Sequence, residues 1–328
     1  MYKIDDVTLS ISNFCPGQCL NCNIYQQDPL FKDEIDLNIY DTILSSDVLK
    51  DTFYFSLTGG EAQLSPKFIP VLDLIQKHKE TDNYQIQTNI SGWHTDIHYK
   101  VAQHALQTTG KDNFRVDISV DGIQEEYEKV RLTSKGWEKV KQTTQALQEL
   151  GIQITYVMIV HKQNYKGIES FVQLCKERGV RWYISFSVER ATFSNQGNIE
   201  YFNTTEMETI EQSLDKIGFL KSKHNVNWEW AKAIYTDSMP LVNCFMGSRS
   251  LVIDPHGNVL PCAGGQEEHL KNLLSFGNIK EFQGNLDTLL HSPHALKVLE
   301  NIQDKKCQPC KLLCAHKIDF PWGKGTGM

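Results

Sequence analysis

The sequence predicts an α/β protein, a partial (β/α)6 barrel of the TIM type followed by a small α+β extension at the C-terminal end. Short β-rich runs alternate with helical segments up to about residue 190, and the alternation breaks there. Strands that alternate with helices in this way predict a parallel sheet with right-handed crossovers. Because a complete eight-unit barrel needs ~250 residues, six units in roughly 190 residues predict a partial barrel.

Six runs rich in Val, Ile, Thr and aromatic residues are the predicted strands. They lie at 7–12, 53–57, 84–88, 115–120, 152–160 and 182–188. Segments with helical spacing of apolar residues lie between them, at about 37–47, 66–78, 96–107, 136–149 and 167–178. Gly151 and Gly179 follow two of these helices, where a positive φ is useful.

The chain after residue 190 has a different pattern. The pair Thr205 and Glu208 predicts a capping box that opens a helix ending near Lys216. A mostly polar stretch at 221–227 predicts a connector. Residues 249–262, with a Pro-His-Gly turn in the middle, predict a β-hairpin, and 286–301 predicts a helix.

Composition narrows the class of protein. The 328 residues include 33 Lys and Arg and 40 Asp and Glu, which gives a net charge of -7. The chain therefore lacks the excess of positive charge that is typical of proteins that bind nucleic acid or an anionic membrane. The chain shows no signal sequence and no apolar run of the ~18 residues needed to span a bilayer. We expect a cytoplasmic protein with no nucleic-acid or membrane partner. Its expected units are a barrel over 1–190, a connecting helical segment over 191–243 and the extension over 244–328.

The nine cysteines carry most of the functional information. In a reducing cytosol, cysteines serve more often in metal binding or catalysis than in disulfides. Cys175 lies alone in a predicted helix, where we expect a small buried hydrophobic residue. The others form two groups: Cys15, Cys19 and Cys22 near the start, and Cys244, Cys262, Cys307, Cys310 and Cys314 in the last third.

The first group follows directly on the first predicted strand, with the spacing Cys-x3-Cys-x2-Cys. Three thiolates on one loop can hold three irons of a [4Fe-4S] cube and leave the fourth iron open to a small molecule. The alternative is a structural zinc site, but zinc prefers four ligands and no Cys or His follows Cys22 before His78. The second predicted strand ends in Gly59-Gly60-Glu61, and glycines there let the backbone approach a ligand at the active-site face of a barrel.

Together these motifs resemble the radical S-adenosylmethionine (SAM) superfamily, in which a three-cysteine loop follows strand one and Gly-Gly-Glu follows strand two. Further matches are Thr88-Asn89 and the run 119–122, and the resemblance covers about residues 7–190. It implies that the first three cysteines hold a [4Fe-4S] cluster whose open iron is chelated by SAM. The implied chemistry is reductive cleavage of SAM to a 5′-deoxyadenosyl radical, which abstracts hydrogen from a substrate carbon, while the protein binds, orients and excludes water.

The same resemblance implies which residues lie near SAM. They are Gly59, Gly60 and Glu61 for the amine, and Asn89, Ser119 and Arg131 for the ribose and carboxylate. Ordinary polarity at strand ends is the alternative for the last three. The family usually has an aromatic residue before the third cysteine, beside the adenine, but this chain has Asn21. We therefore expect adenine contacts from backbone groups and from other strands.

The second group of cysteines predicts another metal site. The predicted hairpin brings Cys244 and Cys262 together, and the last three cysteines lie on a short loop after a predicted helix. A structural zinc site is the alternative to an iron–sulfur cluster. The end of the hairpin, Gly-x4-Cys, resembles the twitch or SPASM extension of some radical SAM enzymes, with cysteine spacing most like 2-deoxy-scyllo-inosamine dehydrogenase.

With five cysteines in place of seven, the resemblance to SPASM implies one auxiliary [4Fe-4S] cluster. Its expected ligands are Cys244, Cys262, Cys307 and Cys310. Cys314 could replace one of them, lie inert beside the cluster, or donate a hydrogen atom to a substrate radical.

An auxiliary cluster with four protein ligands can accept an electron from a substrate radical. We therefore expect a two-electron oxidation of a small molecule such as a sugar or aminocyclitol, with Glu189 or His161 as the base and a flavodoxin- or ferredoxin-type electron donor.

The alternative is a SPASM-type peptide maturase that cross-links, oxidises or epimerises a ribosomal peptide. Such enzymes often carry an N-terminal leader-binding domain, for which Cys15 lies too early. A simple electron carrier is disfavoured, because it has no need of an open iron and a SAM pocket.

Overall fold

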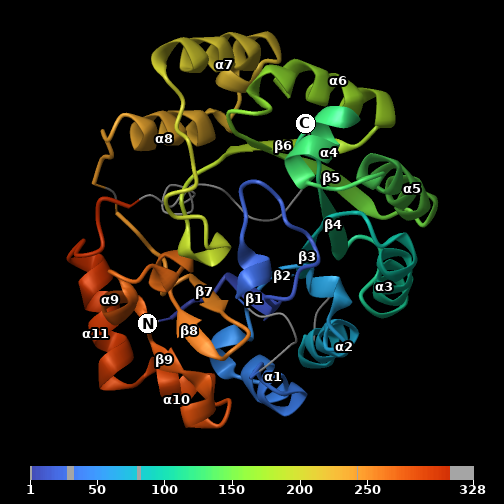
Figure 1. Cartoon of the computed structure of the whole chain (residues 1–328). Coiled ribbons are helices and arrows are strands. Elements are labelled where there is room, and N and C mark those ends of the chain that lie inside the picture. Colours follow the sequence, from blue (N-terminus) through green and yellow to red (C-terminus); the bar gives the residue numbers. More distant parts are fainter. Residues whose placement is uncertain (1, 28–32, 80–82, 242, 311–328) are drawn as a thin grey trace.

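The structure is a computed structural model of the chain, and it describes residues 2–27, 33–79, 83–241 and 243–310. Within these residues, nine strands form one sheet in the order β6-β5-β4-β3-β2-β1-β7-β8-β9, and Figure 1 labels them. The strands are β1 (Asp6–Ser12), β2 (Tyr54–Gly59), β3 (Gln85–Ile90), β4 (Phe114–Ser119), β5 (Gln153–Val160), β6 (Arg181–Phe186), β7 (Ser250–Ile253), β8 (Asn258–Leu260) and β9 (Gly277–Asn278).

Strands β1 to β6 pair in parallel, each with the next, which confirms the predicted six-stranded partial barrel. The two faces of the sheet differ, because successive side chains of a strand point to opposite sides. In β5, Ile154, Tyr156 and Met158 are buried, whereas Thr155 and Val157 between them line a cavity. The outer face is therefore packed core, and the inner face surrounds the cavity.

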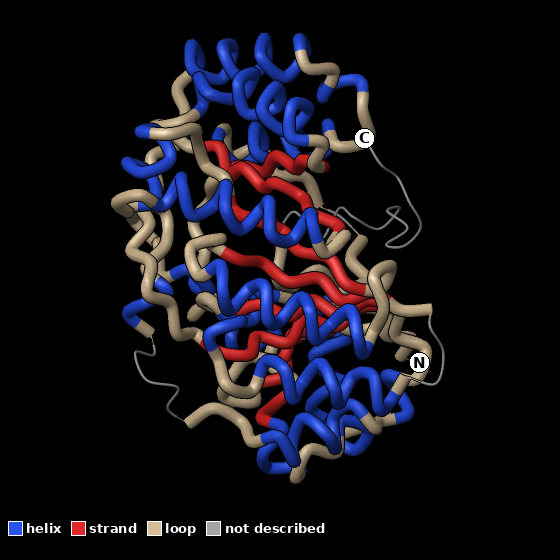
Figure 2. Tube along the Cα trace, turned by 90° about the vertical axis from the view of Figure 1, so that its right-hand side faces the viewer, coloured by secondary structure: helices blue, strands red, loops and turns tan. Residues whose placement is uncertain are grey.

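Helices cover the outer face of the curved sheet, which runs through the middle of the molecule in Figure 2. The helices that follow strands of the barrel are α1 (Leu37–Leu44), α2 (Phe68–His78), α3 (Thr95–Thr108), α4 (Glu125–Arg131), α5 (Gly136–Glu149) and α6 (Ile168–Arg178). The later helices are α7 (Thr204–Lys216), α8 (Asn225–Tyr235), α9 (Lys271–Leu274), α10 (Leu286–Leu290) and α11 (Pro293–Gln303). Cys175 is fully buried in α6, as predicted. Among the described residues, no helix combines the length and the apolar character needed to cross a membrane.

Two predicted helix boundaries were wrong. The capping box of α7 is formed by Asn203 and Glu206, two residues before the predicted pair, because Asn203 accepts a hydrogen bond from the Glu206 amide at 2.9 Å. The single helix predicted at 286–301 is two helices. Pro293 begins α11 and Ser292 caps it, with the Ser292 hydroxyl accepting from the Ala295 amide at 3.2 Å.

The predicted connector at 221–227 was wrong in its second half, because α8 begins at Asn225. This helix packs along the edge of β6. The buried Asn227 amide donates to the Ile184 carbonyl at 3.0 Å, and the Tyr235 hydroxyl donates to the Ser187 carbonyl at 3.0 Å. Side chains of α8 thus satisfy carbonyl groups at an edge that another strand could otherwise pair with.

The predicted hairpin is confirmed as the antiparallel pair β7 and β8. It also extends the sheet of the barrel, because β7 pairs in parallel with β1, from Asp6 opposite Ser250 to Leu9 opposite Ile253. Asp5, just before β1, forms an ion pair with Arg249, just before β7. The C-terminal extension is therefore built onto the first strand, beside the loop that carries the first three cysteines.

Candidate functional site

The loop after β1 carries Cys15, Cys19 and Cys22, all partly exposed. It turns back on itself, with the Cys22 amide donating to the Cys19 carbonyl at 3.1 Å. Burial raises the pKa of the Cys15 thiol to about 12, and nearby Glu61 and the other two cysteines add to the rise. Burial also raises the pKa of the Cys22 thiol. Three cysteines on one loop are a donor set that a cationic metal centre would bind as thiolates.

The two glycines at the end of β2, Gly59 and Gly60, lie directly against the start of this loop. The Gly60 amide donates to the Ser12 carbonyl, and the Glu61 amide donates to the Phe14 carbonyl, both at 2.8 Å. Gly59 has φ of 139°, and a Cβ there would lie 1.9 Å from the Ser12 carbonyl oxygen. A Cβ on Gly60 would lie 2.3 Å from the Phe14 carbonyl oxygen. Glycine is therefore required at both positions by the close approach of two backbones.

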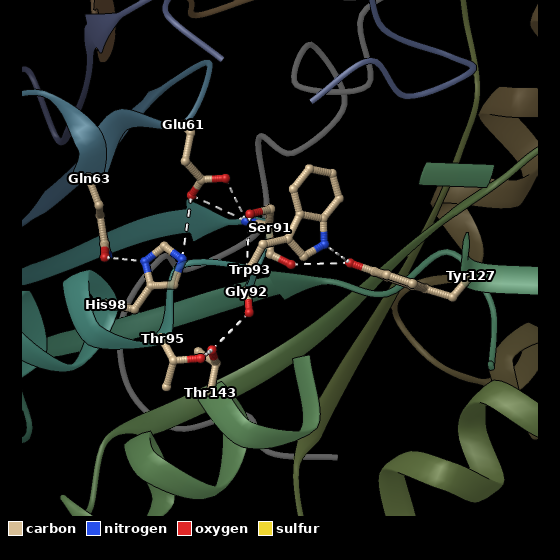
Figure 3. Close-up of polar contacts among 9 residues, drawn as sticks. All are labelled: Glu61, Gln63, Ser91, Gly92, Trp93, Thr95, His98, Tyr127 and Thr143. Atoms are coloured by element: carbon tan, nitrogen blue, oxygen red, sulfur yellow. Dashed lines mark hydrogen bonds and ion pairs between the residues drawn. The ribbon is translucent and has the colours of Figure 1, made fainter. Parts of the chain in front are cut away.

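The side chain of Glu61 is buried and points toward Ser91 and His98, as Figure 3 shows. Its carboxylate accepts from the Ser91 amide at 3.0 Å and lies 3.9 Å from Nε2 of His98. His98 is also buried, and its Nδ1 lies 2.8 Å from the Gln63 amide oxygen. Burial raises the pKa of Glu61 to about 7 and lowers the pKa of His98 to about 3. This carboxylate therefore links the glycine turn to the loop after β3.

Besides Glu61, the side chains of Tyr127 and Thr143 hold the loop after β3 (Figure 3). The Tyr127 hydroxyl donates to the Ser91 carbonyl at 3.2 Å and accepts from the Trp93 indole at 2.6 Å. The Thr143 hydroxyl donates to the Gly92 carbonyl at 2.8 Å. The Trp93 ring in turn packs against Gly17 of the cysteine loop, where a Cβ would lie 3.0 Å from the ring. The cysteine loop is thus supported by a fixed aromatic side chain.

Arg131, the last residue of α4, lies beside the same loop. Its guanidinium pairs with the buried Asp121 carboxylate at 2.6 Å and donates to Sγ of Cys19 at 3.5 Å. The other Asp121 oxygen accepts from the Ile159 amide at 2.7 Å. Arg131 therefore places a paired positive charge next to the cysteine sulfur.

A cavity of about 620 Å³ lies inside the barrel. Gly59 and Asn89 line it, whereas Ser119 and Arg131 do not. Its polar side chains are connected through Gln87, whose amide nitrogen donates to Asn89 at 2.6 Å and to Asp117 at 3.0 Å. The predicted SAM residues thus separate into those that line the cavity and those that support the loops around it.

A second cavity of about 310 Å³ is lined by four cysteines from three separate segments: Cys244, Cys262, Cys307 and Cys310. The described residues contain no three His, Cys, Asp or Glu side chains that converge on a single metal ion. Four thiols around a cavity of this size fit a larger group, such as an iron–sulfur cluster. Met246 and Cys262 line both cavities, so the two spaces adjoin.

A segment after β6, residues 190–195, connects the two cysteine sites; we call it the bridge segment. In Figure 1 it lies between the blue loop after β1 and the orange turn after β8. On one side, the Phe193 carbonyl accepts from the Asn23 amide at 2.7 Å, and the buried Asn195 amide donates to the Asn21 carbonyl at 2.9 Å. On the other side, the Ala191 amide donates to the Glu267 carboxylate at 2.8 Å.

The predicted catalytic residues lie apart from one another. Glu189 lines the cavity of the four cysteines, and its carboxylate accepts from the Gly197 amide at 2.9 Å. His161 is buried, lies 2.7 Å from Gln163, and lines neither cavity. Cys314 lies outside the described residues. Sequence reasoning did not single out Phe193, Asn195 or Met246, because nothing in their local pattern distinguishes them from ordinary loop residues.

Comparisons with known proteins agree with this arrangement. The family model "Radical SAM superfamily" matches residues 9–175, about half of the chain. The model "Iron-sulfur cluster-binding domain" (SPASM) matches residues 244–314. The two matches contain the two groups of cysteines, whose described members lie at separate sites in the structure.

Two curated relatives come from Bacillus subtilis (strain 168). The sporulation killing factor maturation protein SkfB is 22% identical over 78% of this chain. The antilisterial bacteriocin subtilosin biosynthesis protein AlbA is 23% identical over 87% of it. The alignments span 59% of the length of each relative.

Solved structures share the fold. SuiB of Streptococcus suis bound to S-adenosylmethionine aligns with a TM-score of 0.67 at 14% identity, covering 95% of this chain and 72% of SuiB. SuiB bound to the precursor peptide SuiA aligns with a TM-score of 0.64 at 15% identity, covering 96% and 71%. From the family match and this fold, the chain belongs to the radical SAM superfamily with a C-terminal SPASM domain, and its cofactors are SAM, a [4Fe-4S] cluster and auxiliary iron–sulfur clusters.

Proposed function

We propose that this protein is a peptide maturase that acts by hydrogen-atom abstraction from a carbon of its substrate. The observation that carries the proposal is the contact of the two cavities at Met246 and Cys262. A substrate in the larger cavity would lie between the two cysteine sites. When bound, SAM with its cluster supplies hydrogen-atom abstraction, and an auxiliary cluster supplies an electron acceptor.

The relatives favour a peptide over the sugar or aminocyclitol expected from the sequence. SkfB is named for maturation of a killing factor, AlbA for biosynthesis of a bacteriocin, and SuiB has been solved with a precursor peptide. The position of Cys15 does not decide between the two substrate classes, because a leader-binding unit can reside elsewhere. The substrate class that we propose is therefore a peptide.

The proposed ligands follow the two cysteine sites. Cys15, Cys19 and Cys22 would hold the SAM-binding cluster, and Cys244, Cys262, Cys307 and Cys310 the auxiliary cluster. We assign Gly59, Gly60 and Glu61 to SAM through their backbone, since the Glu61 carboxylate is engaged with Ser91. Asn89 would meet SAM through its side chain, which lines the cavity, while Ser119 and Arg131 would support the site from outside it.

We propose a net two-electron oxidation, in which the peptide loses a hydrogen atom, an electron and a proton. Among the predicted bases, Glu189 is better placed than His161 to take the proton, because it lines the cavity next to the substrate space. A flavodoxin- or ferredoxin-type protein would supply the electron that starts the reaction, in the cytoplasm. An oxidation of this kind would make the protein an oxidoreductase.

The test is to reconstitute the chain anaerobically and supply SAM and dithionite with two separate probes. One probe is the precursor peptide SuiA together with a pool of short synthetic peptides, and the other is 2-deoxy-scyllo-inosamine. We expect 5′-deoxyadenosine formation coupled to loss of two hydrogen atoms from a peptide, detected by mass spectrometry. C15A is the matched control and should form no 5′-deoxyadenosine.

Oxidation of the cyclitol to a ketone, with peptides unchanged, would overturn the peptide proposal in favour of small-molecule oxidation. Formation of 5′-deoxyadenosine with deuterium incorporated from D2O at a peptide α-carbon, and no loss of hydrogen, would overturn the oxidation and indicate epimerisation.

A further inference from the structure

The adenine of SAM is a flat aromatic base, and such bases bind in proteins by stacking on exposed aromatic side chains. The cysteine loop offers no such ring, because none of the residues from Cys15 to Asn23 is aromatic. Asn21 precedes the third cysteine, and its carbonyl accepts a hydrogen bond from the Asn195 side chain. A ring that stacks on the adenine would therefore have to come from another segment that lines the same cavity.

The bridge segment supplies a suitable ring at Phe193. This side chain lines the barrel cavity and is 42% exposed. Its exposure makes a flat apolar surface available without displacing a packed neighbour. An exposed phenylalanine inside a binding cavity is a candidate ligand contact rather than a part of the core.

The backbone at Phe193 is bound to the residue that follows the third cysteine. The Asn23 amide donates to the Phe193 carbonyl at 2.7 Å, and the Asn23 side chain donates to the Ser194 carbonyl at 3.1 Å. The Gln27 amide adds a bond to the Ser194 hydroxyl at 2.6 Å. These bonds hold the backbone at Phe193 beside the cysteine loop before any ligand arrives, which reduces the entropic cost of binding.

The other aromatic rings that line the cavity already have partners. Tyr54 accepts a hydrogen bond from Arg115 at 2.6 Å, and the Arg115 guanidinium lies 5.1 Å from the centre of its ring. Trp182 stacks on Phe219 with centroids 6.3 Å apart, and Tyr183 packs edge-on against His224 at 6.1 Å. Within the described part of the chain, the Phe193 ring makes no comparable contact.

We propose that Phe193 is the residue on which the adenine of bound SAM stacks. The assignment concerns cofactor binding, so it does not depend on the substrate class proposed above. Replacing a stacking aromatic residue by alanine costs base binding about tenfold in affinity. F193A should therefore weaken SAM binding about tenfold, whereas F193W should keep it within about threefold of the wild type.

The test measures binding, not turnover. Wild-type, F193A and F193W proteins are reconstituted anaerobically, matched for iron content, and titrated with three probes: SAM, 5′-methylthioadenosine and methionine. 5′-Methylthioadenosine carries the adenine without the amino acid, and methionine carries the amino acid without the adenine. Y99A is the matched control, because Tyr99 is an aromatic residue that is 36% exposed on α3, outside both cavities.

The expected result is a loss of about tenfold in affinity for SAM and 5′-methylthioadenosine in F193A, with methionine binding and the Y99A protein unchanged. F193A that binds SAM as tightly as the wild type would overturn the assignment. An equal loss for methionine would also overturn it, because the ring would then support the loop rather than the base. The same holds if F193W binds SAM as weakly as F193A. The substrate proposal survives each of these results, since it is tested by the product formed.

Discussion

Glu61 is a carboxylic acid in a place that water does not reach, with its side chain 3% exposed. Its pKa of about 7 means that the folded chain resists ionising it, whereas an unfolded chain ionises it near the ordinary value of 4.5. The stabilisation from this group is therefore complete below pH 4.5 and is lost as the pH rises through about 7. The acid that links the glycine turn to the loop after β3 thus costs stability at neutral pH.

We predict that E61Q removes this pH dependence in the metal-free chain. Gln can still accept a hydrogen bond from the Ser91 amide but cannot ionise. E61Q should be similar to the wild type near pH 4.5 and more stable by about 3 kcal/mol above pH 7.5, the equivalent of the pKa shift. Urea unfolding followed by circular dichroism across this range measures the difference.

The exposed Glu125 on α4 gives the control, and E125Q should follow the wild-type pH profile. A constant difference between E61Q and the wild type at every pH would show that Glu61 ionises in the folded chain as easily as in the unfolded one, against the prediction.

At the scale of the element, the bridge segment is held by side chains rather than by regular secondary structure. Asn195, the last residue of the segment, is 2% exposed and uses both the oxygen and the nitrogen of its side-chain amide. The oxygen accepts from the Arg190 amide at 2.7 Å, and the nitrogen donates to the Asn21 carbonyl at 2.9 Å. One buried side chain therefore joins the cysteine loop to the segment that faces the second cysteine site.

We predict that N195D weakens this junction. The substitution preserves shape but places a carboxylate oxygen against the Asn21 carbonyl, so one hydrogen bond becomes a repulsive contact in a buried site. The free energy of unfolding should fall by about 2 kcal/mol, the cost of a buried polar group without its partner. Urea unfolding measures it, and the iron retained by the first cluster after gel filtration gives a second reading.

Asn198 is exposed three residues away, so N198D introduces the same chemistry without burial and should change neither reading. N195D with wild-type stability and wild-type iron retention would show that the junction does not support the cysteine loop.

At the scale of the whole molecule, one sheet carries both cysteine sites. Because β7 pairs with β1, the hairpin leading to Cys262 and the loop leading to Cys15 start from neighbouring strands. The cavity inside the barrel adjoins the second site, because Met246 and Cys262 line both spaces. Gly59, which lies against Ser12 at the end of β1, also lines this cavity. The relative position of the two sites is thus set by strand pairing rather than by a flexible connection.

We predict that the two sites load separately. The wild-type chain should bind about eight irons, and C307A/C310A should bind about four, because two ligands of one [4Fe-4S] cluster are gone. The double variant should still bind SAM, since the first three cysteines are intact. C175A is the matched control and should keep about eight irons, as Cys175 is buried in α6, away from both sites.

Iron counting and SAM binding after anaerobic reconstitution measure both quantities. A wild-type content of about four irons would contradict the second cluster. A double variant that retains about eight irons would instead contradict the assignment of Cys307 and Cys310 as ligands.

Much of the fold could be predicted because its signals are local. The strands of the barrel lie within a few residues of their predicted positions, since alternation of apolar side chains and turn glycines are properties of short windows. Errors occurred where a neighbouring residue competed for the same role. Asn203 took the cap expected at Thr205, and Pro293 divided a helix that apolar spacing alone made continuous.

The candidate site could be predicted only as far as its spacing allowed. The first cysteine group and the Gly-Gly-Glu turn are short motifs. In the structure, Gly59 and Gly60 lie against the backbone of Ser12 and Phe14, while their contact with SAM stays a prediction. The direction of the Glu61 carboxylate was not predictable, because it depends on Ser91 and His98, which lie on segments distant in sequence. Phe193 was missed for the same reason.

The sequence by itself determined the succession of strands and helices and the cysteine motif after the first strand, since each of these follows from residues close together in the chain. With the spacing of the later cysteines, this motif determined the cofactor chemistry of the protein. Only the tertiary structure decided that β7 pairs with β1, that four cysteines from three segments surround one cavity, and that the bridge segment ties both sites together. The physical reason is that pairing and packing join residues far apart in sequence, and their energies depend on burial and hydrogen-bond partners that no short window contains.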